Sequence, residues 1–92
     1  MPSTNAPPGH FKVLYFAAAS SYTKKDHEML KAPLPASGLL TLLGNEYPGI
    51  EALLSSCAVT VNLQYIDLEE EDGHLMINEG DEVAIIPPVS SG

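Results

Sequence analysis

Basic residues are scarce in this sequence of 92 residues. Four lysines and no arginine stand against twelve acidic residues, which gives a formal net charge of −8. Binding to phosphate backbones needs clustered Lys and Arg, so this composition argues against a nucleic-acid partner and equally against an anionic membrane surface. Opposite electrostatic fields steer association, so the chain is better suited to a basic protein partner.

Cysteine is almost absent as well. Cys57 is the only one, which excludes a disulfide framework, a zinc cluster or an iron–sulfur cluster within one chain. Residues 1–10 have neither a basic nor an apolar segment of the kind found in signal peptides, and no apolar run approaches the ~20 residues that span a bilayer. We therefore expect a cytoplasmic protein in a reducing compartment.

Two interpretations of Cys57 are open. It could act as a nucleophile in a sulfur relay, or it could be a small buried hydrophobic residue on the apolar face of a strand. The second is favoured because free cysteine is among the most buried residue types. The three histidines are scattered among polar residues without a metal-ligand spacing, and the acidic run 69–72 lacks the pattern of a calcium loop, so no metal site is expected.

The hydrophobic fraction of 45% is that of a folded protein, and its periodicity predicts short strands and helices in alternation. Residues 57–63 alternate, with Cys57, Val59, Val61 and Leu63 on one face. Ser37 is expected to cap the main helix. The predicted strands cover 11–17, 28–34, 57–63, 65–68 and 83–86; the predicted helices cover 37–47 and 50–54; 20–25, 69–73 and 78–81 are predicted turns or loops.

This order of elements predicts an α+β domain with a mixed sheet and one main helix packed on one face. If the first and last strands pair in parallel at the centre, the arrangement is the ubiquitin-like β-grasp. We expect a disordered N-terminal lead-in over 1–10, the domain over 11–86 and an extended C-terminal tail over 87–92, because Pro87 and Pro88 end the last strand.

Three stretches of the sequence carry a family resemblance. They are Lys12-Val13-Leu14-Tyr15-Phe16-Ala17, Val61-Asn62 with Tyr65-Ile66, and Gly80-Asp81-Glu82-Val83-Ala84-Ile85-Ile86-Pro87-Pro88-Val89. In that order they resemble the opening strand, the middle segment and, very closely, the closing signature of the small subunit of molybdopterin synthase, a family of ubiquitin-like sulfur carriers. The resemblance runs in order over residues 11–92 and implies the β-grasp fold.

The resemblance also implies a role. In the family an activating enzyme, an adenylyltransferase and sulfurtransferase, adenylates the C-terminal glycine, and sulfur then replaces AMP to give a thiocarboxylate. The tail enters the large catalytic subunit, in a heterotetrameric assembly, and donates sulfur to cyclic pyranopterin monophosphate. Carried over, the acyl position falls on Gly92, with Ser91 in place of the family's penultimate glycine. No permanently bound cofactor is implied, only the transient acyl adenylate and thiocarboxylate, and catalytic residues are expected on the partner.

The tail itself is suited to insertion. A terminal glycine lets other backbone approach closely, and two prolines stiffen the base of the tail in an extended form. We expect contacts with the large subunit from the residues at and behind this base: Tyr65, Ile86, Pro87, Pro88, Val89, Ser90 and Ser91. Tyr65 and Ile86 could instead belong to the core.

Two other functions remain as alternatives. The chain could be a sulfur carrier of another pathway, of the thiamine type, or a ubiquitin-like binding module with no chemistry at its tail. A stand-alone enzyme is disfavoured, because a nucleophile, a base and an orienting group in one pocket are not apparent in so small a chain.

Overall fold

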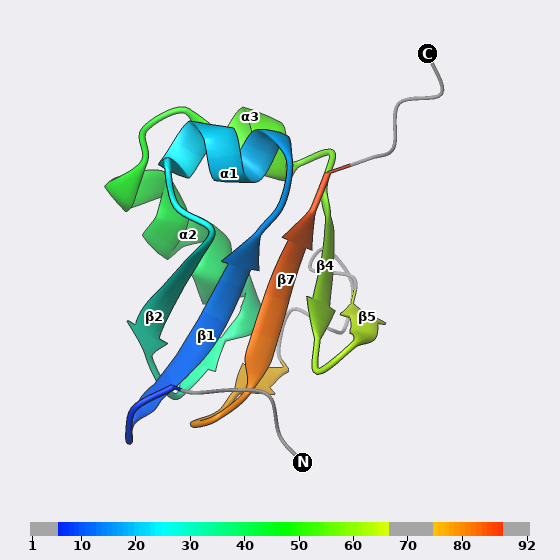
Figure 1. Ribbon diagram of the computed structural model, residues 1–92. Helices are drawn as coiled ribbons and strands as arrows, with labels where there is room; N and C mark the ends of the chain where they lie inside the picture. The colour runs from blue at the N-terminus through cyan, green and yellow to red at the C-terminus, as the bar shows by residue number, and fades with distance from the viewer. Residues whose placement is uncertain (1–5, 67–74, 88–92) are drawn as a thin grey trace.

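The computed structural model describes residues 6–66 and 75–87. Short strands dominate it, and three helices lie among them (Figure 1). The strands are β1 (His10–Tyr15), β2 (His27–Lys31), β3 (Leu34–Pro35), β4 (Ala58–Val61), β5 (Gln64–Ile66), β6 (Met76–Ile77) and β7 (Glu82–Ile86), and the helices are α1 (Ala18–Thr23), α2 (Ala36–Glu46) and α3 (Ile50–Leu54). No helix within these two ranges is long and apolar enough to cross a bilayer.

The main sheet has the order β2-β1-β7-β4-β5, with the first and last strands of the chain side by side at its centre. β1 and β7 run parallel, whereas β1–β2, β7–β4 and β4–β5 are antiparallel. A second, two-stranded sheet pairs β3 with β6. The predicted mixed sheet with its central parallel pair is therefore confirmed.

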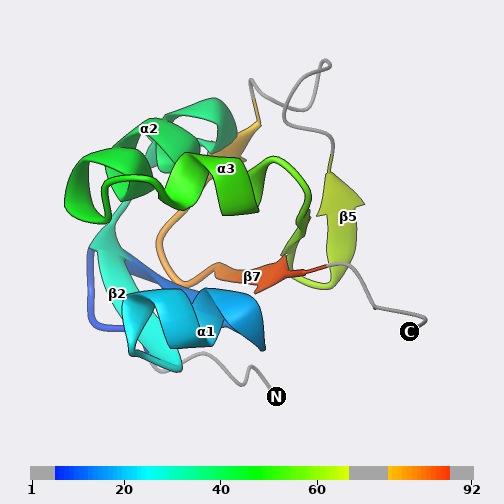
Figure 2. The same cartoon turned by 90° about the horizontal axis from the view of Figure 1, so that it is seen from above.

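The helices leave one face of the sheet uncovered. Seen from above, α2 and α3 cover one face, while α1 lies across the end of the sheet where β1 and β7 finish (Figure 2). The core lies between the sheet and these helices, and its fully buried residues include Phe11, Val13, Val83 and Ile85 from the strands and Leu39, Leu43 and Ile50 from the helices. The predicted leucine stripe of the main helix is thus core.

The segment predicted as a polar turn over 20–25 is largely helical, since α1 runs from Ala18 to Thr23. The sequence of α1 shows little apolar periodicity, because the helix buries only Ala19 and Thr23. The Tyr22 hydroxyl ties the helix to the rest of the domain by donating to the carbonyl of Pro48 at 2.7 Å, and within the helix the Thr23 hydroxyl donates to the carbonyl of Ala19 at 3.0 Å. Side-chain periodicity reports apolar packing and misses a helix held in this way.

The alternation predicted through Leu63 stops two residues earlier. β4 ends at Val61, and Asn62 and Leu63 form the two-residue turn to β5 with φ of 52° and 71°. Two central residues with positive φ are the signature of a tight hairpin turn whose twist matches its strands. Leu63, predicted to face the core, is therefore 86% exposed.

Three further boundaries differ from prediction. His10, placed in the disordered lead-in, pairs with Lys31 in the sheet, and the Gly9 amide donates to Glu79. The strand predicted over 28–34 is divided into β2 and β3, and β6, which pairs with β3, was not predicted. Pro35, rather than Ser37, precedes α2, and no side chain caps that helix.

Candidate functional site

The base of the tail lies at the end of the main sheet where β1 and β7 finish and β4 begins. β1 and β7 are parallel and in register, with Tyr15 beside Ile85, so both finish at this edge. β4 begins at the same edge, because Ala58 pairs with Ile86 in the antiparallel direction. Ile86 and Pro87 are half-buried there. The chain therefore leaves the domain from a rigid central strand that neighbours support on both sides.

An apolar row crosses the uncovered face of the sheet, which we call the open face. Residues directly opposite one another in paired strands point to the same face. The register places Leu14, Ala84, Thr60 and Tyr65 in one row across β1, β7, β4 and β5. Alternation adds Phe16 and Ile86 one step nearer the tail. We define the apolar patch as Leu14, Phe16, Tyr65, Ala84 and Ile86.

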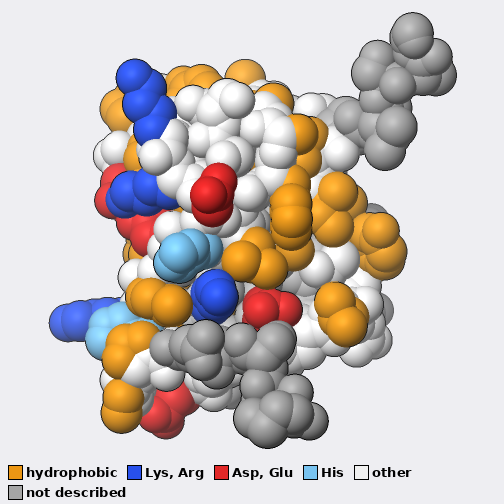
Figure 3. All heavy atoms as spheres, viewed as in Figure 1, with side chains coloured by type: hydrophobic (Ala, Val, Ile, Leu, Met, Phe, Trp, Pro, Cys, Tyr) orange, Lys and Arg blue, Asp and Glu red, His pale blue; other side chains and the backbone are white. Residues whose placement is uncertain are grey.

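Part of this patch is accessible, whereas Leu14 and Ile86 are half-buried and Ala84 is buried. Tyr65 is 70% exposed and Phe16 is 46% exposed, although both are large hydrophobic residues. In the space-filling view of the open face, hydrophobic side chains gather over β1, β7, β4 and β5 (Figure 3). Contiguous exposed apolar surface on a small domain usually marks a partner-binding site. Of the predicted partner-binding residues, Tyr65 and Ile86 share this face, with Pro87 at its edge.

The remaining predicted site residues lie outside the described ranges. These are Pro88, Val89, Ser90, Ser91 and Gly92. Their roles therefore stay predictions, and the geometry bears only on the strand from which they extend.

Ala17, which follows β1 at this edge, has a strained backbone. Its φ of 50° and ψ of −121° suit glycine far better than a residue with a Cβ. Such backbone strain tends to cluster at functional sites, where the surrounding structure maintains it. Ala17 lies two residues beyond Tyr15, the last residue of β1 that pairs with β7. Sequence reasoning missed this residue, because alanine carries no signal for positive φ.

Cys57 immediately precedes β4, next to the base of the tail. Its Sγ is 3.2 Å from the carbonyl oxygen of Leu53, to which the thiol donates. Burial raises the pKa of the thiol, so the reactive thiolate is scarce near neutral pH. The side chain packs against the core as a small hydrophobic residue, but it is only half-buried and lies outside β4, so it is less enclosed than the predicted buried position on the strand.

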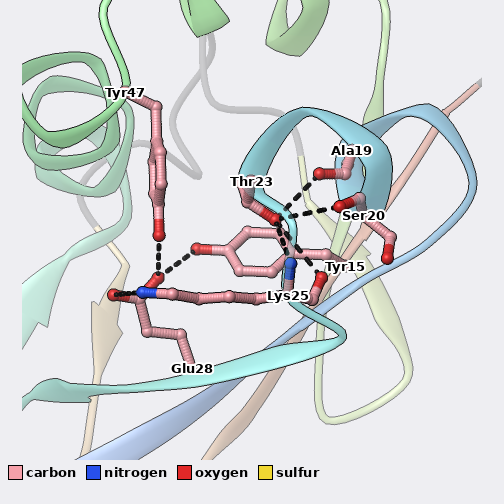
Figure 4. Close-up of polar contacts among 7 residues, drawn as sticks. All are labelled: Tyr15, Ala19, Ser20, Thr23, Lys25, Glu28 and Tyr47. Atoms are coloured by element: carbon pink, nitrogen blue, oxygen red, sulfur yellow. Dashed lines mark hydrogen bonds and ion pairs between the residues drawn. The ribbon is translucent and has the colours of Figure 1, made fainter.

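A polar cluster joins the helices to the sheet on the covered side. The hydroxyls of Tyr15 and Tyr47 both donate to Oε1 of Glu28 at 2.9 Å, and Nζ of Lys25 lies 3.3 Å from Oε2 (Figure 4). Burial alone would raise the pKa of Glu28, but the three donors outweigh burial and hold it below its usual value. Burial, followed by the bond to Glu28, raises the pKa of Tyr15. All four residues have mutual partners, so the cluster is structural.

The rest of the described surface offers little for chemistry. A hollow of about 320 Å³ lies at the end of the sheet opposite the tail, between the β4–β5 turn and Asp81, with Gln64 and Met76 among its lining residues. In the part of the chain that the structure describes, no three His, Cys, Asp or Glu residues are grouped so that they could hold a metal ion.

Comparison with known proteins finds one matching family and several similar relatives. The model of the ThiS family matches residues 13–92. The chain is 62% identical over 88 residues to the molybdopterin synthase sulfur carrier subunit of Pyrenophora tritici-repentis, covering 95% of each chain. It is 57% identical to the protein of the same name from Phaeosphaeria nodorum, covering 100% of each chain.

Among solved structures, SAMP1 from Haloferax volcanii superposes with a TM-score of 0.74 at 20% identity, covering 91% of this chain and 100% of that one. At that identity the likeness shows the fold alone. The neighbours include ubiquitin-like modifiers, so the β-grasp prediction is confirmed.

Proposed function

The chain belongs to the ThiS family, and from that premise we propose that it is the sulfur carrier subunit of a molybdopterin synthase. The observation that carries this proposal is the 62% identity to a protein of that name over nearly the whole of both chains. Relatives this similar over their full length normally share their function as well as their fold. The thiamine-type carrier is less well supported, because the similar relatives bear the molybdopterin synthase name.

The proposed chemistry takes place on Gly92. An oxygen of its carboxylate attacks the α-phosphorus of ATP in the activating enzyme, pyrophosphate leaves, and an acyl adenylate forms. Hydrosulfide (HS⁻) then attacks the acyl carbon, AMP leaves with the bonding pair, and the resulting thioacid loses its proton to give a thiocarboxylate. The chain's own contribution is to present this carbon without a hindering side chain and at the end of an extended tail. Six residues from Pro87 to Gly92 reach roughly 19 Å.

Delivery requires the carrier to dock beside a partner's pocket, and we propose that the apolar patch provides this contact. It surrounds the base of the tail, so its burial would position the tail over the pocket's entrance. Such an assembly is supported by a solved structure of a similar fold. A chain in the protein–protein complex of subunits 1 and 2 of molybdopterin-converting factor from Helicobacter pylori superposes on this chain with a TM-score of 0.61 at 24% identity. By analogy, the large catalytic subunit is the proposed partner here, with cyclic pyranopterin monophosphate as the sulfur acceptor.

The test uses the chain with the activating enzyme, ATP and a sulfur donor, followed by intact mass spectrometry. Conversion of the terminal carboxylate to a thiocarboxylate replaces one oxygen by sulfur and raises the mass by about 16 Da, as the atomic masses require. A variant with one residue added after Gly92 should not be converted, because its carboxylate is displaced by about 3.3–3.6 Å. Ser91→Gly should be converted at least as well as the wild type, since it adds no side chain.

Two results would contradict the proposal. Unchanged mass of the wild type under conditions that convert a known carrier would favour a binding module without chemistry at its tail. Normal conversion of the extended variant would show that Gly92 is not the reacting residue. In each case, circular dichroism of the variants confirms that the fold is intact.

A further inference from the structure

Charge is distributed very unevenly along the chain. Residues 1–31 hold all four lysines and only two acids, whereas residues 32–92 hold ten acids and neither lysine nor arginine. The formal charges of these two parts are +2 and −10. In the fold, the lysine-rich part forms β1, β2 and α1, so the positive charge lies along one edge of an otherwise acidic domain.

The register brings part of this charge to the open face. His10 stands opposite Lys31, Lys12 opposite Met29, and Leu14 opposite His27. Because paired residues share a face and alternate residues repeat it, four basic side chains lie together on the face that carries the apolar patch. We name them the basic strip: His10, Lys12, His27 and Lys31. Figure 3 shows basic and histidine side chains along this margin, beside the hydrophobic ones.

The strip is available for contact. Lys31 and His27 are exposed, and Lys12 and His10 are half-buried. Within residues 6–66 and 75–87, Lys25 forms an ion pair with Glu28 on the covered side, and no ion pair in these ranges involves Lys12 or Lys31. Glu82 stands beside Lys12 in the register of β7 with β1.

The strip and the patch are continuous but chemically different. Lys12 pairs in register with Glu82, four residues before Ile86 on β7, so it lies about 13 Å from the end of the strand from which the tail extends. Burial of apolar surface is non-directional and would tolerate several rotations of the carrier on its partner. Charges at the far end of the same face discriminate between rotations and speed the encounter.

We propose that the basic strip meets acidic side chains on the large subunit, beside the surface that receives the apolar patch. This inference rests on the proposed function and adds the charge of the partner surface that borders the apolar contact. The carrier as a whole favours a basic partner, so an acidic contact at this margin is a specific requirement and not a consequence of net charge. The large subunit should therefore present acid opposite β1–β2, which an unrelated basic protein would not.

Two charge reversals provide a matched test. Lys31→Glu lies in the strip, while Lys24→Glu lies after α1 in the connection to β2, outside the paired strands of the sheet. Both lysines are exposed and both changes lower the net charge by two, so the global effect is equal. We measure association of each variant with the cognate large subunit at low ionic strength and in about 1 M salt, where the Debye length is about 3 Å.

Lys31→Glu should slow association about fivefold at low ionic strength, and Lys12→Glu combined with Lys31→Glu about tenfold or more. Lys24→Glu should change it less than about twofold, and high salt should remove the differences. Equal slowing by Lys31→Glu and Lys24→Glu, or no slowing by Lys31→Glu, would overturn the inference. If the wild-type carrier does not bind the large subunit at any salt concentration, the proposed function fails as well.

Cross-linking checks the contact directly. A carbodiimide joins a lysine amine to a carboxylate with loss of water, and only where the two groups touch. In the wild-type complex, mass spectrometry should find Lys12 or Lys31 joined to Asp or Glu of the large subunit, and Lys24 should not be joined to it. Cross-links from Lys24 but none from Lys12 or Lys31 would contradict the proposed contact, even if the complex forms normally.

Discussion

The two faces of the five-stranded sheet are made by alternate residues of the same strands, yet they differ in what surrounds them. On the covered face, Phe11, Val13 and Ile85 have no exposed surface, because α2 and α3 pack on them. On the open face, Phe16 and Tyr65 keep about half or more of their surface exposed. One strand thus supplies stability through one set of positions and recognition through the other, and each set can be changed separately.

The largest effect should come from the covered face. Phe11→Ala removes a fully buried aromatic side chain from β1 and should lower the free energy of unfolding by about 3–5 kcal/mol. That is a large part of the stability of a domain of this size. Urea denaturation followed by circular dichroism measures the change. A loss below about 1 kcal/mol would mean that the helix layer collapses into the space and that this face is less tightly packed than it looks.

On the open face the same kind of truncation should leave stability alone and weaken binding. Tyr65→Ala should change the free energy of unfolding by less than about 0.5 kcal/mol. Affinity for the large subunit should fall tenfold or more, equivalent to about 1.4 kcal/mol, since exposed aromatic residues often anchor interfaces. Isothermal titration calorimetry gives the affinity. Leu63→Ala, which truncates an 86% exposed apolar side chain at the β4–β5 turn, is the control and should bind normally.

The polar cluster sharpens the comparison, because it stabilises the covered side by charge and not by apolar burial. Glu28→Gln replaces the acceptor of two tyrosine hydroxyls and the partner of Lys25, and should cost about 2 kcal/mol at neutral pH. The folded-state pKa of Glu28 is lowered, so its contribution is complete above the unfolded-state value and disappears as pH falls through the folded-state value.

Thermal unfolding of Glu28→Gln and wild type across pH therefore gives a further expectation. The two proteins should differ most near neutral pH and converge only as the pH falls below the folded-state pKa of Glu28, which lies under the usual value for glutamate. A difference that grew on acidification would mean that the carboxylate is destabilised in the fold, contrary to its three donors.

The smallest effect is expected where the two faces meet, at Ala17. Ala17→Gly relieves a positive-φ strain of about 1–3 kcal/mol but adds backbone entropy to the unfolded chain, so a net gain of about 0.5–1 kcal/mol is expected. Calorimetry should show a melting temperature a few degrees higher. Ala18→Gly, one residue on and inside α1, is the control and should destabilise the protein. A destabilising Ala17→Gly would indicate that the conformation at this edge differs from the one described.

The features predicted correctly from sequence are those that depend on the spacing of apolar residues. Alternation over β4 and the leucines of α2 report burial against one large core, whereas the parallel pairing of β1 with β7 was expected from the family resemblance. What could not be predicted depends on polar contacts and backbone geometry. α1 is held by hydroxyl hydrogen bonds, and Leu63 lies at a turn that usually requires glycine or asparagine.

The candidate site also contains residues that the sequence could predict and residues that it could not. Tyr65 and Ile86 could be named from sequence, but alternation alone could not decide between core and surface for either. That decision depends on which face the helices cover. The basic strip was beyond sequence reasoning, because Lys12 and Lys31 are brought to one face only by the register of β1 with β2. The described residues place the base of the tail, and Gly92 lies outside them.

The central position of β7 has a mechanical consequence. A force applied to the C-terminal end of β7 along the strand axis would be shared by two ladders, because β7 is bonded to β1 on one side and to β4 on the other. Such a force loads the hydrogen bonds of both ladders together in shear, whereas a strand at a sheet edge can be peeled away bond by bond. β7 therefore ends at the place where the described part of the domain best resists mechanical pulling.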